Sequence, residues 1–144
     1  MNQISRILRS TVHYLGNVLR HTHIVYLRAS GVKIGKGCMI SLRAKIDTRR
    51  GMVSIGDNCT ITYGTVILSH DRSAMHINPH DSGEGEVKIG NNVYMGVNSI
   101  ILRNVTIGDN TVIGAGAVVT SSLPPNVVAV GNPARVIKEI TRDC

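Results

Sequence analysis

Large aromatic side chains are nearly absent from this sequence of 144 residues, which has no Phe, no Trp and an aromatic content of 3%. An ordinary globular core draws much of its buried area from such rings. The core must therefore be built from Ile, Val, Leu, Ala and Met. Proline is also scarce, with 4 residues against 15 glycines, a balance that favours many tight turns over a linker-rich chain.

Long apolar runs are missing as well. No stretch approaches the roughly 20 apolar residues that cross a bilayer. Arg6 and Arg9 interrupt the N-terminal stretch, where a secretory signal needs an apolar core. The cysteines Cys38, Cys59 and Cys144 lack metal-ligand spacing, and the first two fall in apolar-patterned segments, which suits small core residues in a reducing compartment. The sequence therefore predicts a single cytoplasmic domain without a metal site.

The chain carries a formal net charge of +7. A surplus of this size suits a surface that meets a phosphate-bearing cofactor, a nucleic acid or an anionic membrane. Proteins that bind nucleic acids commonly interleave aromatic side chains with basic ones for base stacking, and this sequence shows no such interleaving. Nucleic acid is therefore not an expected partner.

Aliphatic residues recur at every sixth position along most of the chain. The spacing slips by three residues around Arg49–Gly51 and is interrupted from about Ser69 to Glu86. A period of six is a multiple of the two-residue strand period, so each repeat can present the same strand face. Short strands joined by turns at this period predict an all-β triangular solenoid of about four coils, with about 18 residues in each coil. The repeated positions are Ile34, Ile40, Ile46, Ile55, Ile61, Ile67, Ile89, Met95, Ile101, Ile107, Ile113 and Val119.

Three segments, Ile89–Gly96, Val105–Thr120 and Gly131–Lys138, carry a resemblance to a known family. They resemble the hexapeptide-repeat acyltransferases, and within these the maltose, galactoside and polysaccharide O-acetyltransferases, over about residues 32 to 140. The resemblance implies a left-handed parallel β-helix. It also implies acetyl-CoA as the acyl donor, a sugar, nucleotide-sugar or polysaccharide acceptor, and a homotrimer whose coenzyme A groove lies between neighbouring subunits.

The chain divides by its patterns into three parts. We expect an N-terminal helical cap at 1–30, the β-helix at 31–124 with an inserted loop at about 69–87, and a tail at 125–144 that contains a short terminal helix or edge segment over 135–142. Apolar residues from Ile4 to Leu19 have helical spacing, with arginines among them. This helix is expected to cap the first coil, and its alternative role is contact with an anionic membrane.

Histidine is the usual general base for acyl transfer, because its ordinary pKa lies near neutrality. His70 follows a repeated aliphatic position by three residues and stands where the long interruption begins, the place at which the family carries its catalytic histidine. Its orienting partner is expected to be Asp71, with Glu84, Glu86 and a backbone carbonyl as alternatives. His76 and His80 are expected to shape the acceptor site from the inserted loop, which we interpret as a long structureless segment that reaches toward a neighbouring subunit.

The resemblance also implies where coenzyme A binds. The maltose and galactoside enzymes carry Ser where this chain has Val97, so a backbone N–H must stabilise the oxyanion. They also carry Trp where this chain has Tyr94, which favours the polysaccharide O-acetyltransferases within the family. Two turns would flank the pantetheine arm and two cations would meet the phosphates. The residues implied are Gly96, Val97, Gly114, Ala115, Thr120, Arg135 and Lys138.

Three other functions are compatible with the repeat. A γ-type carbonic anhydrase would need three zinc-binding histidines from neighbouring coils, and no histidine follows His80. A non-catalytic trimeric scaffold would need neither His70 nor the basic pair Arg135 and Lys138. An N-acetyltransferase would use the same base with an amine acceptor.

Overall fold

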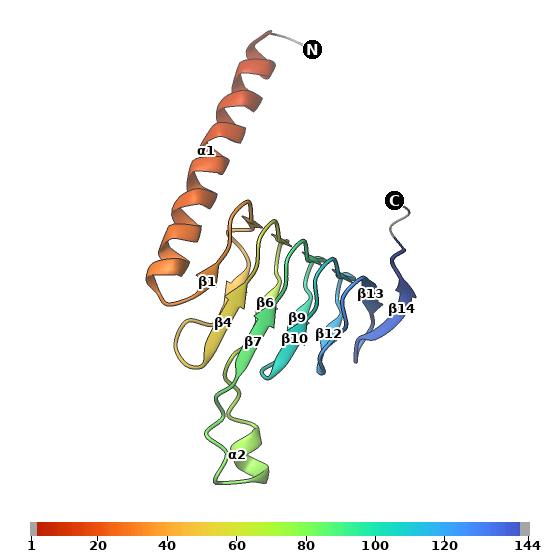
Figure 1. Cartoon of the computed structure of the whole chain (residues 1–144). Helices are drawn as coiled ribbons and strands as arrows, with labels where there is room; N and C mark the ends of the chain where they lie inside the picture. The colour runs from red at the N-terminus through yellow and green to blue at the C-terminus, as the bar shows by residue number, and fades with distance from the viewer. Residues whose placement is uncertain (1–2, 142–144) are drawn as a thin grey trace.

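The computed structural model describes residues 3–141, which form one long helix, three sheets whose strands are parallel except for the last one, and a projecting loop (Figure 1). Helix α1 spans Gln3–Ala29, and a short helix α2 spans Ala74–Ile77 within the loop. The structure thus confirms the N-terminal helix and the parallel sheets. The inserted loop differs from the expected structureless segment, because the helical turn α2 forms at its tip.

The strands form the three flat sides of a prism. In the first sheet the order is β1 (Lys33–Ile34), β4 (Met52–Ile55), β7 (Glu86–Ile89) and β10 (Val105–Ile107). The second sheet contains β2 (Met39–Ile40), β5 (Thr60–Ile61), β8 (Tyr94–Met95), β11 (Val112–Ile113), β13 (Val127–Val130) and β14 (Arg135–Glu139). The third sheet contains β3 (Lys45–Ile46), β6 (Val66–Ile67), β9 (Ile100–Ile101) and β12 (Val118–Val119).

The chain visits the three sheets in turn, and each strand pairs in parallel with the equivalent strand of the next coil. Tyr94 pairs with Val112 and Ile100 with Val118, a register of 18 residues. The sequence separation between paired residues is larger for Lys33 with Ser54 and for Thr60 with Tyr94, because one interruption of the repeat lies between the residues of each pair. Extra residues are therefore accommodated at the corners of the prism, outside the strands.

The repeated aliphatic side chains point into the prism and form a single narrow core. Eleven of the twelve predicted positions are buried, and Ile34 is partly buried against the same core because its coil has a neighbour on one side only. Small polar groups fill one corner, where Thr65 Oγ1 contacts Ser99 Oγ at 3.4 Å and the carbonyl of Gly96 at 3.3 Å. A core of this width accepts branched aliphatic residues and excludes rings, which accounts for the missing Phe and Trp.

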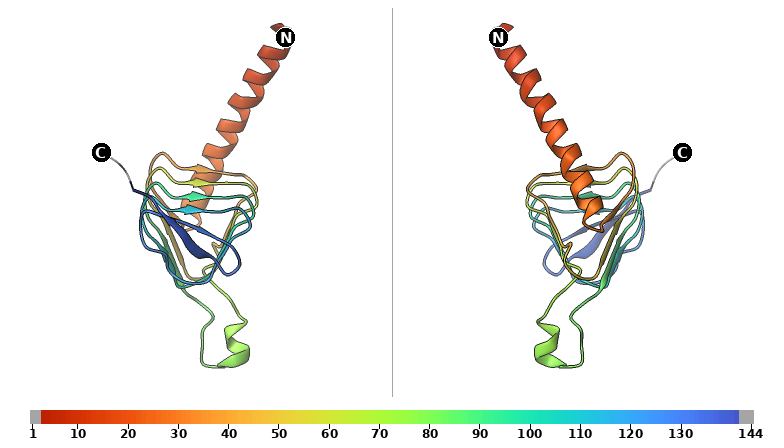
Figure 2. Two further views of the ribbon diagram at one scale, coloured as in Figure 1. Left: turned by 90° about the vertical axis from the view of Figure 1, so that its right-hand side faces the viewer. Right: turned by 90° about the vertical axis from the view of Figure 1, so that its left-hand side faces the viewer.

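The two ends of the prism are closed in different ways. The last turns of α1 pack against the first coil, where Leu27 is buried and Arg28 donates to the carbonyls of Ile34 and Gly35. The N-terminal part of α1 projects beyond the prism (Figure 2). At the other end, β14 pairs antiparallel with β13 as an edge strand, so no terminal helix forms over the described part of 135–142. Arg142 lies outside the described residues.

Strand β10 offers a direct test of this core. Ile107 is 1% exposed and faces inward, whereas its neighbour Thr106 is exposed on the outer face of the same strand. We expect Ile107→Ala to lower the free energy of unfolding by about 2–5 kcal/mol. Thr106→Ala should change it by less than about 0.5 kcal/mol. Urea unfolding followed by circular dichroism measures both, and equal losses would show that residue 107 does not face the core.

Candidate active site

Two side chains from successive coils meet at the corner that follows the third sheet. His70 lies at this corner after β6, and Asp47 lies at the same corner one coil earlier, after β3. The Nδ1 atom of His70 lies 3.1 Å from Oδ2 of Asp47, and their side chains are 20% and 3% exposed. An almost buried carboxylate is therefore held against one nitrogen of a partly accessible imidazole.

Asp47 remains ionised in this position. Burial acts to raise the pKa of its carboxyl group, but the backbone N–H of Arg49 and the ring of His70 hydrogen-bond to the carboxylate and bring that pKa below its ordinary value. A carboxylate that accepts from Nδ1–H fixes the tautomer in which Nε2 carries the lone pair. The pair is thus arranged to accept a proton at Nε2.

The carboxylate of Asp71 does not hydrogen-bond to the ring of His70, contrary to expectation. Its two carboxylate oxygens accept from the backbone N–H and the hydroxyl of Ser73, and these bonds lower the pKa of Asp71. This local turn directs the carboxylate toward the loop. Glu84 is drawn instead to Arg50, 4.0 Å away, and Glu86 to Lys88, 2.8 Å away. None of the three expected carboxylates is therefore the hydrogen-bonded partner of the ring.

Sequence reasoning missed Asp47, although a signal was available. Both interruptions of the repeat follow a strand of the third sheet in successive coils, so the two irregular segments stack on each other. Arg50, in the first of them, accepts a hydrogen bond through its carbonyl from the buried hydroxyl of Ser69, at 2.5 Å. A polar residue beside the first interruption was therefore a candidate neighbour for His70.

The inserted loop leaves the prism through a narrow, hydrogen-bonded neck (Figure 1). The backbones of His70 and Glu84 form an isolated antiparallel β-bridge, and the backbone N–H of Asp71 donates to the carbonyl of Gly83 at 2.6 Å. Arg103, from the next coil, binds Asp81 at 2.8 Å and the carbonyl of Glu84 at 3.1 Å. We call this three-residue contact the neck clasp. It holds the base of the loop against the corner that carries His70.

The expected loop histidines lie apart from the pair. His76 belongs to α2 and His80 follows it, and both are exposed. Beside the His70–Asp47 corner the surface is hollowed, and the hollow is lined by residues of α1, β3 and β6 together with Asp47 itself. Its lining comprises Tyr26, Lys45, Ile46, Asp47, Thr48, Arg49, Val66, Ile67 and Leu68.

The residues implied in coenzyme A binding gather at a different corner, between the second and third sheets. Gly96 and Gly114 begin two turns that stack directly, since the N–H of Gly116 donates to the carbonyl of Val97 at 2.8 Å. A Cβ on Gly96 would meet the backbone of Ala115, so only glycine permits this close approach. Within residues 3–141, the N–H groups of Val97 and Ala115 donate to no protein acceptor.

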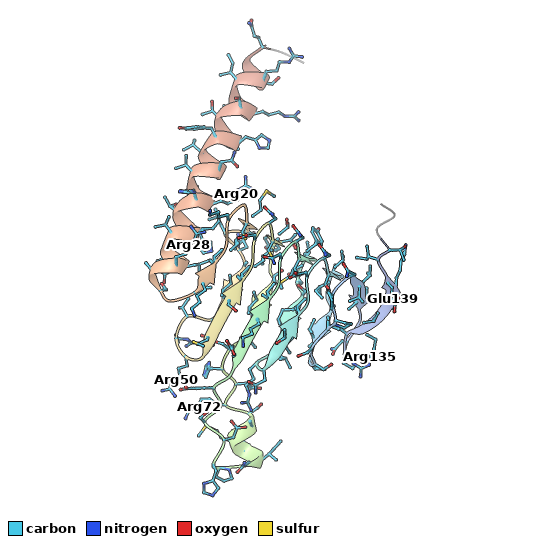
Figure 3. The ribbon with its side chains drawn as sticks, viewed as in Figure 1. Arg20, Arg28, Arg50, Arg72, Arg135 and Glu139 are labelled. Atoms are coloured by element: carbon cyan, nitrogen blue, oxygen red, sulfur yellow. The ribbon has the colours of Figure 1, made fainter. Side chains whose placement is uncertain are left out.

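The two implied cations stand on β14, at the outer end of the second sheet, and Figure 3 labels Arg135. In the ladder between β13 and β14, Arg135 pairs with Val130 and Lys138 pairs with Val128. The register of this ladder shifts by one residue between Val128 and Ala129. The irregularity places both cations on the outward side of the sheet, which a regular strand would not do. Thr120 follows β12 and is exposed.

A single chain therefore does not bring the His70–Asp47 pair together with the residues implied in coenzyme A binding. His70 and Asp47 stand at the edge of the third sheet where its strands end. The Gly96 and Gly114 turns stand at the opposite edge, where those strands begin. Among the residues that the structure describes, no three His, Cys, Asp or Glu side chains gather in a way that could hold a metal ion.

Comparison with known proteins identifies the family of this fold. A family model described as bacterial transferase hexapeptide (six repeats) matches residues 86–121, and one described as hexapeptide repeat of succinyl-transferase matches residues 31–69. Protein CapG of Staphylococcus aureus is 41% identical over 119 residues, which cover 79% of this chain and 69% of that protein. The chain belongs to the hexapeptide-repeat acyltransferases, and its fold is the left-handed parallel β-helix of that family.

Two further relatives are galactoside acetyltransferases. The galactoside O-acetyltransferase of Escherichia coli (strain K12) is 50% identical over 91 residues, which cover 61% of this chain and 44% of that protein. A solved galactoside acetyltransferase in complex with coenzyme A is 31% identical, with a TM-score of 0.60, over 76% of this chain and 65% of that one. The chain thus spans less than half the length of the Escherichia coli relative.

The neck clasp can be tested by exchange of the loop amides. The hydrogen bond from Arg103 lowers the pKa of Asp81, so the pair is fully formed above the ordinary carboxyl range and is lost only as the pH falls through that lowered value. We expect Arg103→Ala to speed hydrogen exchange at Asp71 and Gly85 at pH 6 by roughly tenfold or more. Mass spectrometry of the exchanged peptides measures this.

Arg72 provides the matched control for this measurement, because it is an exposed loop arginine with no ion pair among residues 3–141. Arg72→Ala should leave the exchange of both amides unchanged. Unaltered exchange in Arg103→Ala would mean that the neck is held by its backbone hydrogen bonds alone.

Proposed function

We propose that the chain is an acetyl-CoA-dependent O-acetyltransferase that acts in the cytoplasm on a hydroxyl group of a sugar, nucleotide sugar or polysaccharide. The observation that carries the proposal is the contact of His70 with the nearly buried Asp47 at the mouth of the inserted loop. A base with a fixed tautomer beside a surface hollow is what hydroxyl activation requires. The sugar O-acetyltransferases among the relatives support the acceptor class.

In the proposed reaction, Nε2 of His70 takes the proton of the acceptor hydroxyl while the oxygen of that hydroxyl attacks the carbonyl carbon of the thioester. Asp47 stabilises the imidazolium that forms, at a distance of 3.1 Å. The tetrahedral adduct then collapses to the acetyl ester, and its carbon–sulfur bond breaks. The leaving thiolate recovers the proton from Nε2, so the base ends the cycle as it began.

The oxyanion requires donors that are not already engaged. The N–H groups of Val97 and Ala115 meet this requirement and lie at stacked turns, so either can donate to the developing charge. The neighbouring Gly96 and Gly114 leave room for the pantetheine arm. Thr120 would line the same groove.

The phosphates of coenzyme A would be met by the two cations of β14. Arg135 and Lys138 face outward on one side of the second sheet, and Arg135 pairs with Val130, against which a Cβ on Gly114 would clash. The Arg135 end of β14 is thus near the Gly114 turn. Two charges along the groove suit a ligand that carries several phosphate groups.

Because the base and the groove stand at opposite edges of the third sheet, the proposal requires two chains. We propose a homotrimer, in which the His70 corner of one subunit meets the Gly96 corner of the next. Three of the four outward side chains of the third sheet are apolar, Val66, Ile100 and Val118, and the fourth is Lys45 on β3. Those of the first sheet are mainly polar, Lys33, Lys88 and Thr106, as suits a side that faces solvent.

We assign the acceptor wall to the inserted loop. Its tip carries Ile77, which is 90% exposed, beside the exposed His76 and His80. An apolar side chain at the end of a clasped loop is suited to contact a neighbouring subunit or the acceptor.

The decisive experiment follows thiol release from acetyl-CoA with a panel of sugars and nucleotide sugars. We expect His70→Ala to lower kcat by roughly a hundredfold to ten-thousandfold while coenzyme A still binds, because only the base is lost. The control, His80→Ala, should change KM for the acceptor more than kcat. Unchanged turnover in His70→Ala would reject this base, and absence of both turnover and coenzyme A binding in the wild type would favour a non-catalytic scaffold.

The role of Asp47 is separable from that of the base. We expect Asp47→Asn to lower kcat by roughly tenfold to a hundredfold, because the imidazolium that forms during proton transfer loses its anionic partner. KM for acetyl-CoA should not change. Asp71→Asn removes a carboxylate of the same kind next to His70 in the sequence, and it should leave kcat unchanged. A loss of kcat in Asp71→Asn alone would restore Asp71 as the partner.

A further inference from the structure

The N-terminal third of the chain has only one sign of charge. Residues 1–46 contain eight of the sixteen Lys and Arg residues and none of the nine Asp and Glu residues. The rest of the chain is therefore close to neutral, and the surplus positive charge belongs to α1 and the first coil. Charge separated in this way produces a local field at one end of the molecule.

Helix α1 contacts its own prism through a narrow strip of its surface. The residues at the contact are Gly16, Arg20, Ile24 and Leu27, which follow one another at helical spacing and are buried or partly buried. Figure 3 shows Arg20 and Arg28 where the helix meets the coils. This strip includes the apolar Ile24 and Leu27, but it lies on the opposite side of the helix from most of its other apolar residues, which therefore take no part in capping the first coil.

The opposite side of α1 is an apolar stripe that no part of the described chain covers. At 100° per residue, its members are centred about 150° away from the contact strip. Their side chains are between 44% and 71% exposed. We define the apolar stripe as Ile7, Leu8, Val12, Tyr14, Leu15, Val18, Leu19, Val25 and Tyr26.

The occupant of this stripe must match both its shape and its charge. The stripe covers nearly half of the helix circumference, which is wider than the seam of a coiled coil. A second copy of α1 would bring a further set of cations and no acidic side chain to pair with them. An apolar side backed by arginines alone is instead the pattern of helices that lie in the interface of an anionic bilayer.

The arrangement of the molecule permits such contact. Helix α1 lies across the first coil, so a surface that met the apolar stripe would have the coils and the loop on the other side of the helix (Figure 2). Within the described residues, no helix is long and apolar enough to cross a membrane. The helix would therefore lie along the bilayer surface.

We propose that α1 binds anionic membrane surfaces through the apolar stripe. Its arginines and the basic first coil lie on the other side of the helix and supply the positive field that attracts the anionic headgroups. This places the acceptor site close to a bilayer, where a lipid-linked or membrane-assembled sugar would be presented. The membrane contact does not depend on the acyl-transfer chemistry.

The test is sedimentation of the full chain with vesicles of phosphatidylglycerol and phosphatidylcholine, and with vesicles of phosphatidylcholine alone. We expect binding to the anionic vesicles that weakens as salt is raised, and at least tenfold weaker binding to the neutral ones. Leu8→Glu combined with Leu15→Glu should weaken anionic binding by roughly a hundredfold or more, because two apolar side chains leave the interface.

Ser10→Glu combined with Asn17→Glu is the matched control, since it adds the same two charges to the polar side of α1. It should weaken binding far less than the stripe variant. Equal losses in the two variants, or no binding to anionic vesicles by the wild type, would overturn the proposal. Light scattering on both variants distinguishes the rival occupant: dissociation of an oligomer in the stripe variant alone would show that a second copy covers the stripe. Circular dichroism confirms that each variant is folded.

Discussion

Parallel hydrogen bonds between successive coils set the position of every other feature of this protein. Tyr94 donates to the carbonyl of Thr111 and Ile100 to that of Ala117, so each coil is held in register with the next. Because the strands are only two to five residues long, a shift of one residue would turn the aliphatic side chains out of the core. The strands therefore tolerate no insertion, and all irregularity is displaced to the corners.

That constraint explains where the chemistry is found. The two departures from the repeat, one short and one long, fall at the same corner of successive coils, so they stack and hold each other through Ser69 and Arg50. Asp47 and His70 flank these departures and are brought within hydrogen-bonding distance by them. The regular part of the prism supplies rigidity, and the irregular corner supplies the proposed base and its partner. Arg103, from a regular coil, links the two parts through the neck clasp.

The ends of the prism differ in chemistry as much as in structure. The last coil is closed by β14, which hydrogen-bonds to β13 and carries two outward cations near the proposed cofactor groove. The first coil is closed by the side of α1 that carries Ile24 and Leu27, which leaves the apolar stripe on the opposite side uncovered. On the proposals made above, one end meets a phosphorylated donor and the other a phosphate-rich bilayer. Both uses follow from cations placed where an open sheet edge had to be covered.

The sequence by itself determined the solenoid, its inward residues and the position of both interruptions, because a strict period of six leaves a core of one shape only. It also identified His70 as the residue at the start of the long insertion and predicted the N-terminal helix. The tertiary structure decided that Asp47 contacts that histidine, that Asp71 bonds to Ser73, and that the groove residues lie at another corner. It also decided which side of α1 faces the prism. Periodicity determines which side chains of the strands face the core. The contacts of corner side chains depend instead on how inserted segments of different length stack, and this stacking is determined only when the coils assemble.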